Sequence, residues 1–461
     1  MILKTITSNF IPLPRKKIFL RDIVFVFSML LIHDVSAQSL LDVYKKGIVK
    51  LTPDIGYAQD NPWDKIFETR YDNPYIIQDK PLSIIMMPSG SVVVNIDRRN
   101  YYLLFDENGK FVKEFGITDI PKKEFRKVHP TNFHPMITGV INNTLFFGIN
   151  DWGQMVCFDF NGNYVKTLDL KYRANKYRGM IPMIDNKIAM VGVTWKRDKN
   201  RNCDFVAIVD YQTGEQKIIW EHYTDKLKQG NHELFSYSYT SKKGGYISTT
   251  TMPFISYFGL SLPPQISFVN DMLSVALPHS GEILTYNVNG KLLSKGSIEW
   301  GKKYLSVEEQ MEIQKRAIER YSKDRVPPSG SKWASHEEEY AKAMESMAKQ
   351  MKEDLNKITT PIPIPVFSNI IKDSDGNLLF FEMLEKDDAD RFYFKGANKF
   401  NVWVYQNGGK FVCQSSFECD DYDLFIAPSK MVFHNGYIYA LQTLKNANGN
   451  PLRLVRFKVG N

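Results

Sequence analysis

Short apolar strands recur along this chain, each followed by a Gly-containing turn and a second strand in which apolar and polar residues alternate. The clearest copies are residues 103–112, 156–165, 208–215, 284–293 and 403–412, and a shortened sixth copy is residues 452–458. Asn-Gly and Gly-Gly pairs supply the positive φ that a tight turn needs, and the alternation lets each strand bury one face. Each copy is therefore predicted to form a β-hairpin.

A second hairpin precedes the first in most repeats. Residues 84–94 turn at Pro88-Ser89-Gly90, residues 431–439 turn at Asn435-Gly436, and residues 137–147 and 181–191 follow the same pattern. Two hairpins make one four-stranded antiparallel sheet, and most adjacent copies lie about 50 residues apart, as propeller blades do.

Such a small sheet cannot bury both of its faces alone, whereas blades stacked around an axis can. The sequence thus predicts an all-β fold, a six-bladed β-propeller of four-stranded antiparallel blades at residues 81–461, with an N-terminal extension at residues 38–80. A string of β-sandwiches is the alternative, but it would need linkers that the sequence lacks and would leave the repeat unexplained. Five or seven blades fit the spacing less well.

The longest interval between copies, from the fourth to the fifth, has a helical pattern. Ser306 and Glu309 form a capping box, and neither Gly nor Pro follows until residues 327–331. A second capping box, Ser335 with Glu338, opens a helix that extends to about Lys357. We predict an α-helical hairpin inserted at residues 304–357.

One face of the second predicted helix is apolar, with side chains at three- and four-residue spacing. They are Tyr340, Met344, Met347, Met351 and Leu355. Such stripes are usually part of a core, so we expect this one to pack on the first helix or on a blade edge. The other interpretation is a lid or a partner-docking surface.

Residues 1–37 have the pattern of a secretory signal peptide. Four cations precede a ten-residue stretch at 23–32 that is apolar except for Ser28, and Val35-Ser36-Ala37 fits signal peptidase. Ten residues are too few to span a bilayer. We expect cleavage after Ala37 and a periplasmic or secreted protein with no stable membrane anchor.

Composition supports strands and argues against a nucleic-acid partner. Aromatic residues make up 13% of the chain, which favours strands, and 43% hydrophobic with 24% charged residues is normal for a soluble protein. The formal net charge is +8, and signal cleavage would remove five basic and two acidic residues and leave +5. That is a mildly basic surface and not a nucleic-acid footprint.

The segments before the first blade and at two of the turns resemble a known family. Residues 49–54 (VKLTPD) and 61–67 (NPWDKIF), taken with residues 105–116 and 371–378, resemble the exported six-bladed propeller proteins of gut anaerobes, which are related in style to TolB-like and NHL-repeat propellers. The resemblance covers nearly all of the mature chain and implies the fold. It implies no catalytic set, because most such proteins have no assigned activity. Many of them are lipoproteins, whereas this chain has no Cys near the predicted cleavage site.

Motifs of enzymes and metal sites are absent from the sequence. It contains no Ser-x-Asp-x-Gly-x-x-Trp box, no G-x-S-x-G elbow and no H-E-x-x-H. Residues 373–377 (DSDGN) have Gly at position four, whereas an EF-hand loop has it at position six, so we expect an Asp-Gly turn there. His129 and His134 lie in an inter-blade connection without further ligands at a familiar spacing. We predict neither a metal nor a cofactor.

The four cysteines form no C-x-x-C pair. Cys157 lies in an apolar strand and is expected to be a small buried hydrophobe. An exported chain could oxidise the others, and Cys413 and Cys419 are the closest pair in sequence. The sequence leaves the redox state of Cys203, Cys413 and Cys419 open.

Topology indicates where a ligand would bind. If each strand crosses its blade in turn, the second-to-third-strand loops and the inter-blade connections open on one face, around the mouth of the central channel. We predict ligand-binding residues in these loops: Arg98, Arg99, Trp152, Trp195, Lys196, Arg197, His279 and Arg391. Arg pairs with carboxylates and Trp stacks on flat faces, which suits an anionic or carbohydrate ligand. For any single residue, solvated loop charge is the more ordinary explanation, so the prediction concerns the cluster.

Two classes of function follow. The leading hypothesis is an exported, non-catalytic binding or scaffold protein for a small molecule, a glycan or a protein. The alternative is a hydrolase or lyase acting on carbohydrate or peptide substrates, with acid/base pairs drawn from carboxylates such as Asp97, Asp151 and Asp198.

Overall fold

A computed structural model describes most of the chain after the predicted signal peptide. The described residues are 39–67, 69–70, 73–77, 81–96, 101–125, 138–141, 145–149, 154–169, 176–196, 201–224, 235–240, 246–252, 262–299, 304–323, 336–383, 398–406, 409–424, 431–447 and 451–460. The signal-peptide prediction, at residues 1–37, lies outside them. No helix in these ranges is long and apolar enough to cross a membrane.

The chain divides into two units, residues 1–43 and 44–461. Helix α2 (Leu40–Lys45) runs across that boundary, and the strands within the described ranges belong to the second unit.

Four sheets of the second unit are four-stranded antiparallel meanders in which strands adjacent in sequence are adjacent in the sheet. They comprise β4 (Pro81–Met86), β5 (Val92–Ile96), β6 (Tyr101–Phe105) and β7 (Phe111–Gly116); β8 (Thr138–Ile141), β9 (Leu145–Ile149), β10 (Gln154–Asp159) and β11 (Tyr164–Asp169); β12 (Lys176–Pro182), β13 (Lys187–Lys196), β14 (Arg201–Asp210) and β15 (Gln216–Thr224); and β18 (Gln265–Val269), β19 (Met272–Ala276), β20 (Glu282–Asn287) and β21 (Leu292–Ser297).

The C-terminal part of the chain forms a larger sheet around an N-terminal strand. It contains β24 (Phe367–Lys372), β25 (Leu378–Glu382), β26 (Lys399–Gln406), β27 (Lys410–Glu418), β28 (Tyr422–Asp423), β29 (Met431–His434), β30 (Tyr437–Leu444), β31 (Leu452–Val459) and β1 (Ile48–Pro53). Smaller elements are the pairs β2 (Thr69–Arg70) with β3 (Asn73–Ile77), β16 (Phe235–Thr240) with β17 (Tyr246–Met252), and β22 (Tyr304–Leu305) with β23 (Ile362–Pro363), and the short helices α3 (Trp63–Ile66), η1 (Ile117–Asp119) and α4 (Lys122–Phe125).

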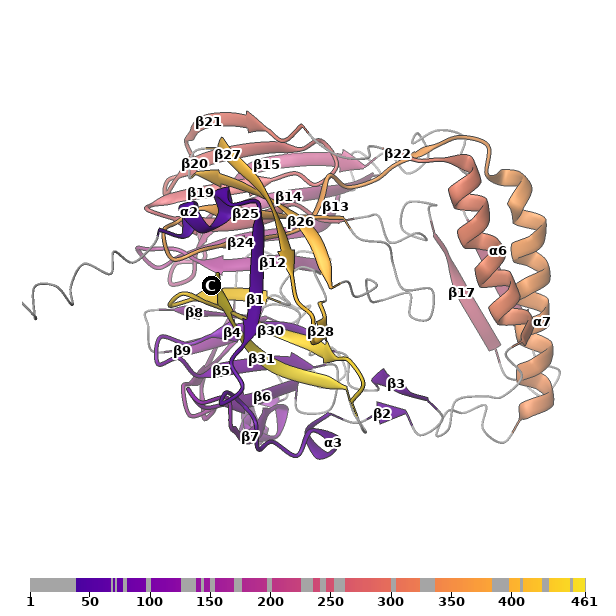
Figure 1. The fold of residues 1–461 in the computed structure, drawn as a ribbon, viewed down its shortest axis with the longest axis horizontal. Coiled ribbons are helices and arrows are strands. Elements are labelled where there is room, and N and C mark those ends of the chain that lie inside the picture. Colours follow the sequence, from indigo (N-terminus) through magenta and orange to yellow (C-terminus); the bar gives the residue numbers. More distant parts are fainter. Residues whose placement is uncertain are drawn as a thin grey trace, which may run out of the picture. The chain divides into compact units, whose positions relative to one another are not determined.

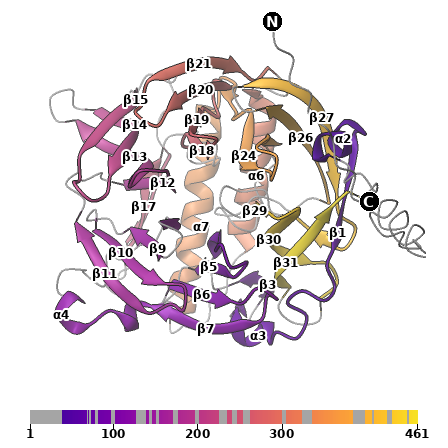
Figure 2. The ribbon, with the colours of Figure 1, turned by 90° about the vertical axis from the view of Figure 1, so that its left-hand side faces the viewer.

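The sheets of residues 44–461 follow one another around a common centre (Figure 2). Their first strands contact one another in the order β4, β8, β12, β18, β24 and β29, and β29 in turn contacts β4. Apolar side chains of neighbouring sheets share cores; one such core joins Val156 and Phe158 of β10 to Tyr102 and Phe115 of the sheet before it. This arrangement is that of a β-propeller, in which each sheet buries its faces against its neighbours.

In the turn between the third and fourth strands of a four-stranded sheet, the recurring Asp or Asn side chain accepts backbone hydrogen bonds in one pattern. Asp106 Oδ1 accepts the N–H groups of Asn108 and Lys110 at 3.0 and 2.8 Å, and Gly109 supplies φ +77°. Asp159 Oδ1 accepts from Asn161 and Asn163 at 2.9 and 2.8 Å in the same way. An Asx side chain that binds backbone groups two and four residues on stabilises the turn locally.

Residues 373–377, the DSDGN segment, form such a turn as well. Asp373 Oδ1 accepts the N–H groups of Asp375 and Asn377 at 3.0 and 2.8 Å, and Gly376 has φ +83°. The expectation of an Asp-Gly turn is therefore confirmed.

Two helices, which follow β22 and precede β23 in the chain, lie side by side (Figure 1). Helix α6 (Val307–Lys323) begins at the expected capping box, because Ser306 Oγ accepts the Glu309 N–H at 3.2 Å and Glu309 Oε2 accepts the Ser306 N–H at 2.9 Å. Helix α7 (Glu337–Glu353) begins after His336, without a side-chain cap, and continues as the 3-10 helix η3 (Asp354–Lys357). The second capping box was predicted around Ser335, which lies outside the described residues.

The apolar stripe of α7 is a core. Tyr340, Met344, Met347 and Met351 are buried and pack with residues of α6 such as Met311 and Ile318. Of the two expected packings, on the first helix or on a blade edge, the structure shows the stripe packed on the first helix.

We call the part of the nine-stranded sheet formed by β28–β31 and β1 the last sheet, and the sheet β4–β7 the first sheet. Strand β1 lies between β31 and β27 in the nine-stranded sheet. It pairs antiparallel with β31, with Leu51 opposite Val459, and parallel with β27, with Lys50 opposite Glu418. Its side chains alternate, so that Val49 and Leu51 are buried while Lys50 and Thr52 are exposed. The sequence pattern placed this segment in an extension and did not predict its partners.

We expect the attachment of β1 to β27 to depend on pH through Glu418. Its carboxylate accepts Lys50 Nζ at 2.8 Å and lies 2.9 Å from Lys399 Nζ, and these two cations lower the pKa of Glu418. A carboxyl whose pKa is lower in the folded protein stabilises it above the unfolded pKa, and this contribution is lost as the pH falls through the folded pKa. The melting-temperature difference between the wild type and Glu418→Gln should therefore shrink between about pH 7 and about pH 3. The double variant Lys50→Gln/Lys399→Gln should lose the same pH dependence. A melting-temperature difference between the wild type and Glu418→Gln that stays constant over this range would contradict the prediction.

Candidate functional site

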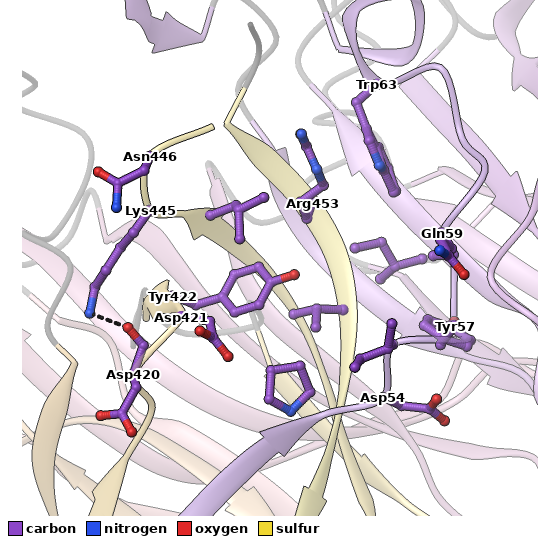
Figure 3. Close-up of a pocket in the computed structure, with 16 residues that line it drawn as sticks. Asp54, Tyr57, Gln59, Trp63, Asp420, Asp421, Tyr422, Lys445, Asn446 and Arg453 are labelled. Carbon is purple, nitrogen blue, oxygen red and sulfur yellow. Dashed lines mark hydrogen bonds between the residues drawn. The ribbon is translucent and has the colours of Figure 1, made fainter. Parts of the chain in front are cut away.

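The described residues enclose a pocket of about 390 Å³ beside the connection from β30 to β31. In the blade formed by β29, β30, β31 and β1, which we call the last blade, this connection joins the second strand to the third. It belongs to the class of loops in which the sequence predicts ligand-binding residues. One wall comes from the segment after β1, residues 54–67, which we call the strap, and the other comes from β28, β30 and β31 (Figure 3).

An arginine of β31 fixes the start of the strap to the last sheet. Arg456 of β31 donates Nε and Nη2 to Asp54 Oδ2, the Nε bond at 3.0 Å. Its guanidinium lies 4.6 Å from the ring centroid of Tyr57 and 4.8 Å from that of Tyr437. A planar cation between aromatic faces and a carboxylate is held in one orientation, so Arg456 positions Asp54 and Tyr57 in the pocket wall.

The other end of the strap is fixed to the first sheet. Asn61 donates Nδ2 to Gly109 O at 2.7 Å and accepts the Phe111 N–H on Oδ1 at 2.8 Å. The N–H of Ala58 donates to Asn108 O at 2.9 Å. The strap therefore bridges the last sheet and the first.

Apolar packing seals the same junction. Trp63 stacks on Phe67 and on Phe105 of β6, with ring centroids 5.9 and 6.2 Å apart. The buried cluster around them also includes Leu452 and Leu454 of β31. Burial of these aromatic rings stabilises the junction between the strap and the two sheets.

The sheet wall carries the polar groups that face the strap. Lys445 Nζ donates to Asp420 O at 2.8 Å, and the Arg453 guanidinium lies 5.5 Å from the Trp63 ring centroid (Figure 3). Tyr422 packs edge-on to Phe457, and burial raises the pKa of its phenol, so the hydroxyl stays protonated at neutral pH. The Asp420 and Asp421 side chains are exposed beside it.

This lining offers both donors and acceptors at close quarters. Lys445 and Arg453 stand in one wall with Asp420 and Asp421, while Gln59 and Asn446 bring amides that can donate and accept. A strongly charged ligand of either sign would meet like charge here, whereas hydroxyl groups can pair with every member of the set. The volume lies at the small end of the range for ligand sites.

Most of the ligand residues predicted from the sequence lie outside the described residues. These are Arg98, Arg99, Trp152, Arg197 and Arg391, as are the carboxylates Asp97, Asp151 and Asp198 and the loop residues His129 and His134. Trp195 belongs to β13, but its side chain is not described. The predicted cluster at the channel mouth therefore stays a prediction.

Two members of that cluster are described, and the structure does not bring them to the pocket. Lys196, at the end of β13, has its Nζ 3.2 Å from Glu221 Oε1 on β15. His279 is exposed in the connection from β19 to β20.

The pocket residues are not among the predicted ligand residues, because the last repeat looks truncated in the sequence. The same loop rule, applied to that repeat, points to residues 445–451, next to Arg453. No such signal exists for the strap, since its role depends on the place where β1 docks.

The cysteines carry no chemistry in this site. All four are free; Cys157 is fully buried, as expected, and burial raises its pKa to about 12. Cys413 and Cys419 are separated by six residues of nearly continuous strand, roughly 20 Å at about 3.3 Å per residue, which is too far for a disulfide. Among the described residues, no group of three or more His, Cys, Asp or Glu side chains is placed to hold a metal ion.

No protein-family model and no curated protein matches this sequence. Solved structures with a similar fold include a member of the DUF4221 family from Bacteroides vulgatus, at 10% identity and TM-score 0.43, covering 90% of this chain and 99% of that one. A streptogramin B lyase matches at 11% identity and TM-score 0.37, covering 85% and 96%, and a gluconolactonase from Xanthomonas campestris at 10% and 0.37, covering 83% and 86%. These matches agree with the propeller fold that the sheet topology defines, and they do not indicate what the chain does.

Proposed function

We propose that this chain is an exported six-bladed β-propeller that binds a small, neutral, hydroxyl-rich ligand such as a mono- or disaccharide, without catalysis, in the pocket between the strap and the last blade. The observation that carries the ligand assignment is the mixed lining, in which Asp421, Gln59 and Arg453 bring acceptors and donors around one space. Export rests on the sequence pattern of residues 1–37 alone.

The blade count rests on the order of the sheets. The four meanders give the first four blades, β24–β27 a fifth, and β29–β31 completed by β1 a sixth. The cycle of contacts from β4 through β29 back to β4 supports this count. In this scheme α6 and α7 form a hairpin inserted between the fourth and fifth blades.

Calorimetric titration of the mature protein with maltose, cellobiose, glucose and glucuronate tests the proposal. We expect a neutral sugar to bind, and Tyr422→Ala with Asn446→Ala to weaken its affinity by about tenfold or more, because two side chains that line the pocket are lost. The anionic glucuronate should bind no better than glucose, since Asp420 and Asp421 face it.

A triple variant in the predicted channel-mouth loops, Arg98→Ala/Trp195→Ala/Arg197→Ala, is the matched comparison. Unchanged affinity in this variant supports the pocket, whereas loss of binding only there would move the site to the channel mouth. Failure of all four sugars to bind would dismiss the ligand class. Turnover of glycan or ester substrates that is lost in the pocket variant would favour the hydrolase or lyase alternative.

A further inference from the structure

The pocket lies where the ring of sheets closes, at the boundary between the last sheet and the first sheet, which we call the seam. Its strap wall includes Tyr57, Gln59 and Trp63, and its sheet wall includes Tyr422, Lys445 and Arg453. The two walls come from opposite ends of the chain, and they lie together where β1 pairs with β31.

The strap makes polar contacts on each side of the seam. On the side of the last sheet they include the Asp54–Arg456 ion pair and the Asp54 N–H to Arg456 O bond at 2.8 Å. On the side of the first sheet they include the two bonds of Asn61 and the Ala58 N–H to Asn108 O bond. Detachment of the strap from both sheets breaks these contacts and separates the pocket walls in the same event.

We propose that ligand binding and ring closure are coupled: the ligand of this pocket bridges strap and last blade and so holds the propeller shut. This inference rests on the proposed function, because it needs a ligand in the pocket. A ligand that binds only the closed form shifts the opening equilibrium by the factor 1 + [L]/Kd. At one hundred times Kd, opening of the seam becomes about one hundredfold rarer.

Amide hydrogen exchange of the full mature protein with and without maltose tests the coupling. The reporters are the N–H groups of Asp54 and Ala58, whose acceptors Arg456 and Asn108 lie on the two sides of the seam. We expect saturating maltose to slow their exchange by about the factor 1 + [L]/Kd obtained by calorimetry, under conditions in which reclosing is faster than exchange from the open form. Amides of β20, in a sheet away from the seam, should not change.

A pair of matched variants separates coupling from general stabilisation. Asn61→Ala removes a side chain that binds Phe111 N–H and Gly109 O at the seam but is not among the residues that line the pocket. Asp159→Ala removes a side chain that binds two N–H groups in the turn from β10 to β11. Each should speed local exchange by about tenfold, and maltose should reverse the effect only in Asn61→Ala.

The outcomes are distinct for the two proposals. Maltose binding that Tyr422→Ala/Asn446→Ala abolishes, with unchanged exchange of Asp54 and Ala58, would overturn the coupling and leave the binding function standing. The coupling would also be overturned if maltose slowed amide exchange in β20 and in the Asp159→Ala turn as much as in the strap. The ligand would then stabilise the whole fold. Absence of any sugar binding would overturn both.

Discussion

Replacing Leu51 by Asp should open the propeller, with a loss of about 4 kcal/mol or more in the free energy of unfolding. Leu51 is 3% exposed and lies in β1 opposite Val459, so the new carboxylate would be buried without a partner. Without β1, the edges of β27 and β31 are left unpaired, which favours aggregation. Urea unfolding followed by tryptophan fluorescence, together with light scattering, measures both effects.

The neighbouring strand position provides the control. Thr52 is exposed on the other face of β1, opposite Lys458, so Thr52→Asp introduces the same charge without burying it. We expect it to change stability by about 0.5 kcal/mol or less, as most exposed substitutions do. Similar unfolding midpoints for the two variants would mean that β1 is not an integral strand of the last sheet.

Gly281→Ala should be the most damaging conservative substitution in the turns, at about 3 kcal/mol. Gly281 has φ +72°, and a Cβ there would lie 2.5 Å from Ile298 O. That oxygen is backbone and cannot turn away as a side chain could. Ile298 itself is buried and donates its N–H to Gly281 O at 2.7 Å, so relief of the clash would break this bond and disturb the core shared by β20 and β26.

Gly436→Ala separates the clash from backbone conformation. Gly436 has φ +80° in the turn from β29 to β30, and a Cβ there would meet nothing within 4 Å. Only the strain of the left-handed conformation remains, about 1 kcal/mol. Thermal melts of both variants give the comparison, and equal losses would show that the contact with Ile298 O is readily relieved.

The hairpins and helices could be predicted from the sequence because their determinants are local. The carboxylate of Asp159 and the glycine at position 162 shape a turn within a few residues, whatever surrounds it. The capping box at Ser306 and the Met-rich stripe of α7 likewise act within one or two helical turns. Regular spacing of these local units was then enough to indicate blades that stack.

The site required the tertiary structure, because its determinants are separated by most of the chain. Tyr57 and Trp63 come from the strap, whereas Tyr422 and Arg453 come from the last sheet. Nothing in residues 48–53 specifies β31 as their partner, since strands pair through backbone groups that every residue other than proline carries alike. The sequence by itself determined the repeating β-hairpins and their helical interruption; which edge β1 completes, and hence where the pocket lies, was decided only when the two ends of the ring met.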